Sequence, residues 1–106
     1  MDLQALSRRA LEIRQQYAEQ ERTAYGRPWT TEEVALGFVG DVGDLAKLVV
    51  ACAGMRAIPN ARAKLAHELA DCLWSILVLA DVHGIDLEYE FLRTMQELEE
   101  RIASSQ

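Results

Sequence analysis

The chain has 106 residues, half of them hydrophobic, and its 17 acidic against 11 basic residues give a formal net charge of −6. We expect a single domain spanning 1–106, because this length supports one modest core and the hydrophobic content argues against disorder. An acidic chain without a basic block excludes nucleic acid as a partner. The sequence has no signal-peptide pattern and no apolar run long enough to cross a bilayer, so we expect a cytoplasmic protein without a membrane partner.

The first predicted helix runs from about Leu3 to Arg22. Its apolar residues recur at alternating spacings of three and four, which is typical of one buried helix face. These residues are Leu3, Leu6, Ala10, Ile13 and Tyr17. Gly26, Arg27 and Pro28 then break the pattern and predict a loop.

The second predicted helix begins after Thr30, because Glu33 three residues later completes a capping box. It continues to about Ala53 and Gly54. Asn60 follows a proline and is the expected N-cap of a third helix.

The third predicted helix ends near His83, before Gly84, and Asp86 caps a fourth helix from Leu87 to about Ala103. Short connections favour antiparallel neighbours, so we expect an all-α fold, a small four-helix bundle. Four short helices with this hydrophobic content leave an apolar face for self-association, which predicts a homo-oligomer. We interpret Cys52 and Cys72 as reduced core residues, since both lie in apolar helical runs.

Two acidic pairs, Asp41 with Asp44 and Glu68 with Asp71, lie within runs that otherwise predict buried helix faces. Side chains at i and i+3 share a face, roughly 5–6 Å apart between Cβ atoms. Two carboxylates at that distance repel by about 3 kcal/mol at an effective dielectric near 20. Acidic pairs also arise by chance on solvated faces, but two pairs within apolar stripes of neighbouring helices predict a cation between them.

Carboxylates alone, without His or Cys, favour a hard cation, Mg²⁺ with Mn²⁺ as a substitute. This donor set points to phosphate chemistry. Gly37, Gly40 and Gly43 lie beside the first pair, and each mid-helix glycine costs roughly 1 kcal/mol relative to alanine. They indicate close approach either by a ligand or by another backbone.

The segments 39–47 (VGDVGDLAK) and 67–74 (HELADCLW) resemble the paired ExxE and ExxD segments of the MazG-like, all-α nucleoside triphosphate pyrophosphohydrolases. The resemblance covers most of 29–101. It implies a Mg²⁺-dependent enzyme that cleaves a nucleoside triphosphate between the α and β phosphates, working as a homodimer or homotetramer. By position it makes Asp41, Asp44, Glu68 and Asp71 the metal ligands, and we assign the catalytic base to Asp44 or Glu68.

Four further residues are candidates for substrate binding. Trp29, in the loop before the second helix, is a candidate platform for the base. Lys47 lies one turn beyond Asp44, and Arg93 and Arg101 lie near the positions where the family carries basic residues in its last helix. For each of these three basic residues, the alternative is an ordinary solvated surface side chain, which the residue pattern alone favours.

The chain departs from the family pattern at two places. Aspartate stands at both positions of the first pair, where the family has glutamate, and Leu98 occupies a position where the family has asparagine. These departures keep two alternatives open. One is a non-catalytic helical interaction module, and the other is a sensor that binds a nucleotide without cleaving it.

Overall fold

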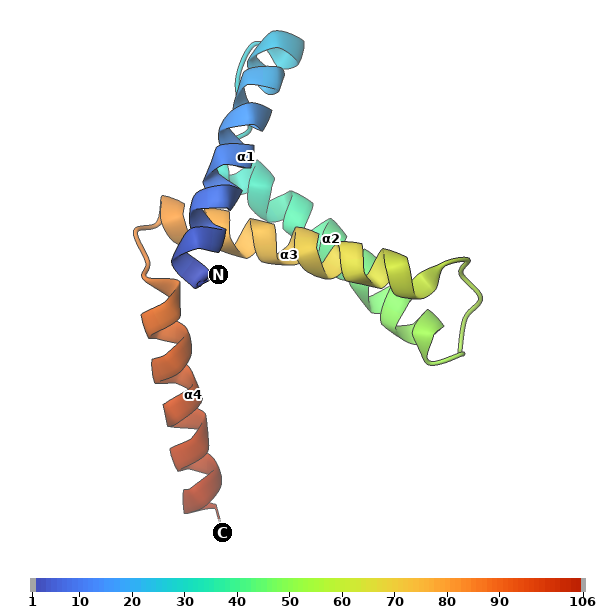
Figure 1. Ribbon diagram of the computed structural model, residues 1–106, viewed down its shortest axis with the longest axis vertical. Helices are drawn as coiled ribbons and strands as arrows, with labels where there is room; N and C mark the ends of the chain where they lie inside the picture. The colour runs from blue at the N-terminus through green and yellow to red at the C-terminus, as the bar shows by residue number, and fades with distance from the viewer. Residues whose placement is uncertain (1, 106) are drawn as a thin grey trace.

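The computed structural model describes residues 2–105 as four α-helices, and this part of the chain contains no strand (Figure 1). The helices are α1 (Leu3–Tyr25), α2 (Thr31–Cys52), α3 (Ala61–Val82) and α4 (Leu87–Ser104). The all-α prediction is therefore confirmed. No helix of the described residues is long and apolar enough to cross a membrane.

All three predicted N-cap residues stand at the start of their helices, and two of them make the expected capping hydrogen bonds. Thr30 and Glu33 form the full capping box of α2, and the Asp86 side chain accepts a hydrogen bond from the Tyr89 backbone N–H at the start of α4. Asn60 occupies the N-cap position of α3 but takes a left-handed conformation, with φ of 55°, and makes no capping hydrogen bond. The predicted N-cap position is therefore confirmed, but Asn60 provides the left-handed turn rather than a side-chain acceptor.

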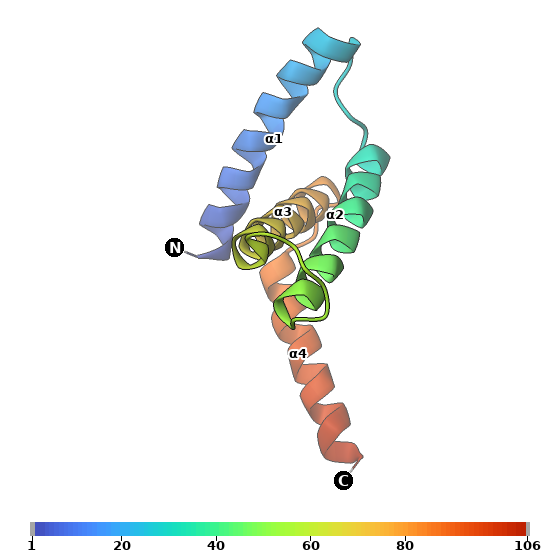
Figure 2. The same ribbon diagram turned by 90° about the vertical axis from the view of Figure 1, so that its right-hand side faces the viewer.

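α2 and α3 form an antiparallel hairpin and lie side by side, while α1 crosses α3 (Figures 1 and 2). The core lies where these three helices meet. The Trp74 indole N–H on α3 donates to the Ala10 carbonyl on α1 at 3.1 Å, and the ring meets Tyr17 edge-on. The buried residues of this cluster are Ala10, Val34, Leu77 and Val78.

α4 extends away from the other helices (Figures 1 and 2), and none of its residues is buried, although Leu87 at its start packs against the core. The radius of gyration is 17.0 Å, compared with about 13 Å for a compact chain of 100 residues. The fourth helix therefore does not close a bundle within one chain. Beyond Leu87, the large apolar side chains of α4 are exposed in the described chain.

Both cysteines are free, and Cys72 is buried. Burial raises the pKa of the Cys72 thiol, and the neighbouring carboxylates raise it further, so the thiol stays neutral and unreactive. Cys52 is exposed at the end of α2, so its assignment to the core was wrong. The apolar run around it belongs to a helix face that this chain leaves uncovered.

Candidate functional site

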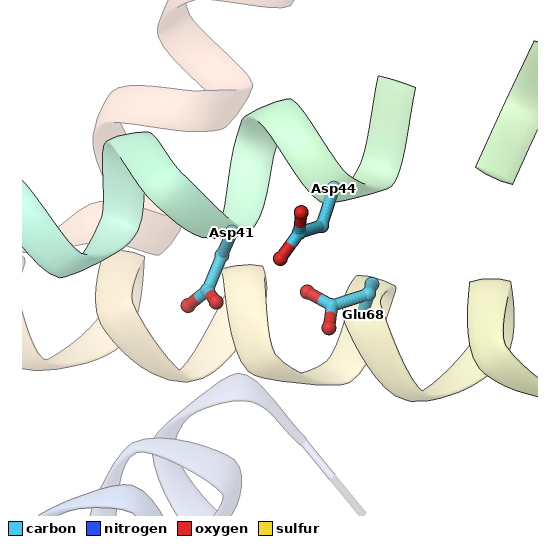
Figure 3. A group of neighbouring side chains, drawn as sticks. All are labelled: Asp41, Asp44 and Glu68. Atoms are coloured by element: carbon cyan, nitrogen blue, oxygen red, sulfur yellow. The ribbon is translucent and has the colours of Figure 1, made fainter. Parts of the chain in front are cut away.

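Three of the four predicted carboxylates meet between α2 and α3. Asp41 and Asp44 come from α2 and Glu68 comes from α3, and their side chains point toward one another across the helix pair (Figure 3). One carboxylate oxygen of each lies within 4.8 Å of the other two. Antiparallel pairing of the two helices therefore gathers three negative groups in one place.

The helix faces explain this placement. Asp41 is half-buried on the side of α2 that carries the buried Leu48, whereas Asp44 lies at the edge of that side and is exposed. Glu68 is half-buried, one turn before the buried Cys72 on α3. Two of the three carboxylates are thus withdrawn from water by the same packing that forms the hairpin.

This burial disfavours the charged state of the carboxylates. It raises the pKa of Asp41 above its ordinary value, and the charges of Asp71 and Asp44 raise it further. The pKa of Glu68 is raised first by burial and then by Asp41, Asp71 and Asp44. Two carboxylates 4.8 Å apart repel by roughly 3 kcal/mol at an effective dielectric near 20. The fold therefore concentrates negative charge where a cation would relieve it.

The residues fit a divalent cation. The Oε2 atom of Glu68 is fully buried and has no hydrogen-bond partner within residues 2–105. An unpaired buried acceptor costs about 1–3 kcal/mol, so such an atom is expected to have a ligand. The three clustered donors are carboxylate oxygens, the ligands that Mg²⁺ and Mn²⁺ prefer.

Asp71, the fourth predicted ligand, lies apart from this group. Its Oδ2 atom pairs with His67 Nε2 at 3.1 Å, one turn back on α3. The two side chains are 43% and 73% exposed, so the pair is weakly held. Asp71 is nevertheless close enough to raise the pKa of both Asp41 and Glu68.

A cavity of about 630 Å³ opens between α1 and the α2–α3 pair, on the side of the carboxylates where Asp41 and Asp71 lie. We call it the aromatic cavity, because four aromatic side chains line it. They are Tyr17, Tyr25, Trp29 and Trp74. Its size and its mixture of apolar walls with a few polar groups are typical of a small-molecule site.

A second cavity, of about 550 Å³, lies on the other side of the carboxylates. Asp44 and Glu68 line it together with Lys47 and Lys64, so we call it the lysine cavity. Neither lysine forms an ion pair within residues 2–105. Asp41 lines the aromatic cavity, Asp44 and Glu68 line the lysine cavity, and His67 lines both, so the carboxylates border an aromatic and a cationic space.

The predicted substrate-binding residues separate into two groups. Trp29 and Lys47 each line one of the cavities. Arg93 and Arg101 lie on α4, which extends away from the site, and they line neither cavity. Arg93 is bound on its own helix to Glu90 and to a second glutamate one turn later. Within one chain, the structure therefore does not bring the two arginines to the carboxylates.

Sequence reasoning missed an ion pair between Arg14 and Glu21, seven residues apart on α1. These side chains are 3.1 Å apart, and both also bind the backbone of Trp29. The spacing of seven places them on one helix face, but their shared target lies in the next loop. Only the tertiary structure reveals it. Lys64 was also missed, since nothing local distinguishes it from a surface lysine.

The three glycines of α2 differ in their surroundings. A Cβ atom at Gly37 would lie 3.4 Å from the Trp29 ring, so this glycine does face a close neighbour. A Cβ atom at Gly40 or Gly43 would meet nothing within 4 Å. The expected close approach is therefore absent from the described chain at these two positions.

Comparisons with known proteins identify the family. A model of the MazG nucleotide pyrophosphohydrolase domain matches residues 27–104, which contain all four predicted ligands. Searches of curated proteins and of solved structures find no significant match. The resemblance seen in the two acidic segments is thus confirmed over most of the chain, and the activity expected of it is that of a nucleotide hydrolase. The chain belongs to the MazG nucleotide pyrophosphohydrolase domain family.

Proposed function

We propose that this protein is a Mg²⁺-dependent pyrophosphohydrolase that cleaves nucleoside triphosphates between the α and β phosphates, giving a nucleoside monophosphate and pyrophosphate. The observation that carries the proposal is the cluster of Asp41, Asp44 and Glu68, with its buried and unpaired Glu68 oxygen. These three side chains would hold the cation, and Asp71 would join them. Mn²⁺ has the same ligand preferences and would substitute.

A divalent cation at this position supplies positive charge for the phosphate oxygens and lowers the pKa of nearby water. The chain's own residues would do the rest. A water molecule attacks phosphorus, the phosphoanhydride bond breaks, and pyrophosphate leaves. A carboxylate oxygen of Asp44 or Glu68 accepts the proton of the water. Either residue suits this role. Asp44 is exposed to solvent, and Glu68 has an oxygen without a hydrogen-bond partner within residues 2–105.

The two cavities favour one orientation of the substrate. The aromatic cavity suits the nucleoside, because a planar base stacks on aromatic side chains such as Trp29. The lysine cavity suits the outer phosphates, because Lys47 and Lys64 are cations beside Asp44 and Glu68 that form no ion pair in the described part of the chain. The bond to be cleaved would then lie over the carboxylates between the two spaces.

The activity is tested by measuring pyrophosphate release from a panel of ribonucleoside, deoxyribonucleoside and modified triphosphates, with Mg²⁺ and with EDTA. We expect release from at least one triphosphate in Mg²⁺, with an equal amount of monophosphate formed, and none in EDTA. Absence of release from every triphosphate would contradict the proposal. Nucleotide binding without pyrophosphate release would then indicate a nucleotide sensor. Absence of both binding and release would indicate an interaction module.

We propose further that the protein works as a homodimer or homotetramer. The outer face of α2 carries Leu36 and Val39, 71% and 67% exposed, next to Gly40 and Gly43 with open space above them. Since mid-helix glycine costs roughly 1 kcal/mol relative to alanine, two uncovered glycines beside exposed apolar side chains suit a second copy packing closely. α4 of that copy would also be the source of any phosphate contact from Arg93 or Arg101.

The assembly is tested with Gly40→Leu, which fills the open space on this face. We expect sedimentation of the wild-type chain as a dimer or larger at micromolar concentration, and a dissociation constant at least about 10-fold higher for the variant, a cost of about 1.4 kcal/mol. Gln15→Leu, at an exposed position of α1 outside both cavities, is the matched control. A monomeric wild-type chain would contradict the proposal.

A further inference from the structure

The α1–α2 connection is held by an ion pair that is mostly withdrawn from water. Arg14 Nη1 donates to Glu21 Oε1 at 3.1 Å, and the two side chains are only 18% and 13% exposed. By contrast, the Arg9–Glu12 pair on the same helix is 64% and 61% exposed. Withdrawing charges from water is unfavourable unless their remaining hydrogen-bonding groups are satisfied, so the partners of the first pair are informative.

Those partners are the two backbone groups of Trp29. Arg14 Nη2 donates to the Trp29 carbonyl at 2.6 Å, and the Trp29 N–H donates to Glu21 Oε1 at 2.6 Å. Both the backbone N–H and the backbone carbonyl of Trp29 are thus bound by charged side chains. Hydrogen bonds to charged groups are stronger than those between neutral groups. The position of Trp29 relative to α1 is set by this arrangement.

The indole held in this way lies on a ligand-sized space. Trp29 lines the aromatic cavity together with Asp41 and Asp71, and its ring passes close to Gly37, where the absence of a side chain leaves room for it. Yet Trp29 remains 43% exposed. A large aromatic side chain that is fixed at its backbone but open at its ring is suited to present that ring to a ligand.

We propose that Arg14 and Glu21 are positioning residues that hold the Trp29 indole over the aromatic cavity, where it stacks on the nucleobase of the bound nucleotide. The inference rests on the proposed function for the identity of the ligand. The ring would recognise a flat base, and the phosphates would lie toward Asp41, which lines the same cavity and belongs to the carboxylate cluster. Arg14 and Glu21 themselves act through Trp29, since their charged groups are engaged with each other and with its backbone.

The test is a double-mutant cycle between Glu21→Ala and Trp29→Ala. The readout is calorimetric binding of AMP, GMP, CMP, UMP and dTMP in Mg²⁺, with inorganic pyrophosphate as a probe that has no base. Base–aromatic stacking contributes about 5-fold to 150-fold in affinity per base. We therefore expect each single variant to weaken binding of the preferred monophosphate by about 10-fold. The double variant should be no weaker than Trp29→Ala, and pyrophosphate affinity should stay unchanged in all three.

Two further variants separate positioning from general stability. Glu21→Gln keeps an oxygen that accepts the Trp29 N–H, so it should recover part of the affinity lost in Glu21→Ala. Glu12→Ala removes the exposed ion pair of α1 and should leave binding unchanged. If Glu21→Ala does not fold, Arg14→Lys, which cannot contact both Glu21 and the Trp29 carbonyl in the same way, replaces it in the cycle.

Additive losses in the double variant would overturn the proposal, as would an equal loss of pyrophosphate affinity or no monophosphate binding by the wild-type chain. These outcomes are distinct from failure of the proposed enzyme activity. If the wild-type chain releases pyrophosphate but the affinity losses in the double-mutant cycle are additive, the positioning role is wrong and the activity stands. If the affinity losses are not additive but no pyrophosphate is released, the nucleobase site stands and the proposed activity is wrong.

Discussion

The variant Glu68→Gln is expected to release pyrophosphate at least about 100-fold more slowly than the wild-type chain, while being more stable than it in the absence of a divalent cation. The loss of activity follows because the variant removes one negative ligand from the group formed with Asp41 and Asp44. Even mutation of residues that only support metal ligands lowers metal affinity or activity by about 10-fold to 100-fold. The gain in stability follows because an amide brings no charge to a position where burial and three neighbouring carboxylates oppose one.

The stability gain has a defined pH dependence. Because the pKa of Glu68 in the folded chain is raised above its ordinary value of 4.5, the folded state binds the proton more tightly than the unfolded state. Wild-type stability from this group is therefore fully present below pH 4.5 and is lost as the pH rises through the raised pKa. The variant lacks this loss, so its advantage should be small at acidic pH and largest at neutral pH.

Thermal melts in EDTA at several pH values, together with pyrophosphate release in Mg²⁺, check both halves of the prediction. Glu19→Gln, which neutralises an exposed glutamate of α1 outside both cavities, is the matched control and should change neither quantity. Wild-type activity in Glu68→Gln, or lower stability than the wild-type chain at neutral pH without a cation, would show that this carboxylate is an ordinary structural residue.

Addition of Mg²⁺ or Mn²⁺ is the second large expected effect. A ligand that binds only the folded state stabilises it by about 2.7 kcal/mol at 100 times its dissociation constant. We expect this stabilisation to be greatest at neutral pH, where Asp41 and Glu68 must be charged despite their raised pKa values. Asp44→Asn should weaken the affinity for the cation at least about 10-fold without loss of helix content.

A monovalent salt at matched ionic strength controls for the general screening of an acidic chain, since screening needs no specific site. The melting temperature in this salt should rise less than in Mg²⁺, and to the same extent in the wild-type chain and in Asp44→Asn. If the salt reproduced the whole effect of Mg²⁺, the carboxylates would not form a site.

Much of the fold could be predicted because its signals are local. Caps and glycines set the helix ends, so the four helices were predicted to within a few residues. α1 continues three residues beyond Arg22, because Gly26 takes the left-handed conformation that ends the helix. The meeting of the acidic pairs was also predictable. Pairs at i, i+3 share one face of a helix, so two such pairs on antiparallel neighbours can face each other, and three of the four carboxylates do.

The remaining features depend on contacts between segments distant in sequence. Asp71 is an exception, because its partner His67 lies one turn away on the same helix, and its i, i+3 spacing to Glu68 gave no sign of that pairing. The contacts of Arg14 and Glu21 with Trp29 join a helix to the loop that follows it. α4 extends away from the other helices, and most of its large apolar residues are exposed in the described chain. Periodicity identifies an apolar face but not what covers it.

The central claim is that carboxylates of α2 and α3 hold one divalent cation between them. Anomalous diffraction from crystals grown with Mn²⁺ tests it most directly. We expect a peak between Asp41, Asp44 and Glu68, with carboxylate oxygens at roughly 2.0–2.6 Å from it, and a much weaker peak in crystals of Asp44→Asn. A fully occupied Mn²⁺ elsewhere, with these three side chains unliganded, would contradict the account.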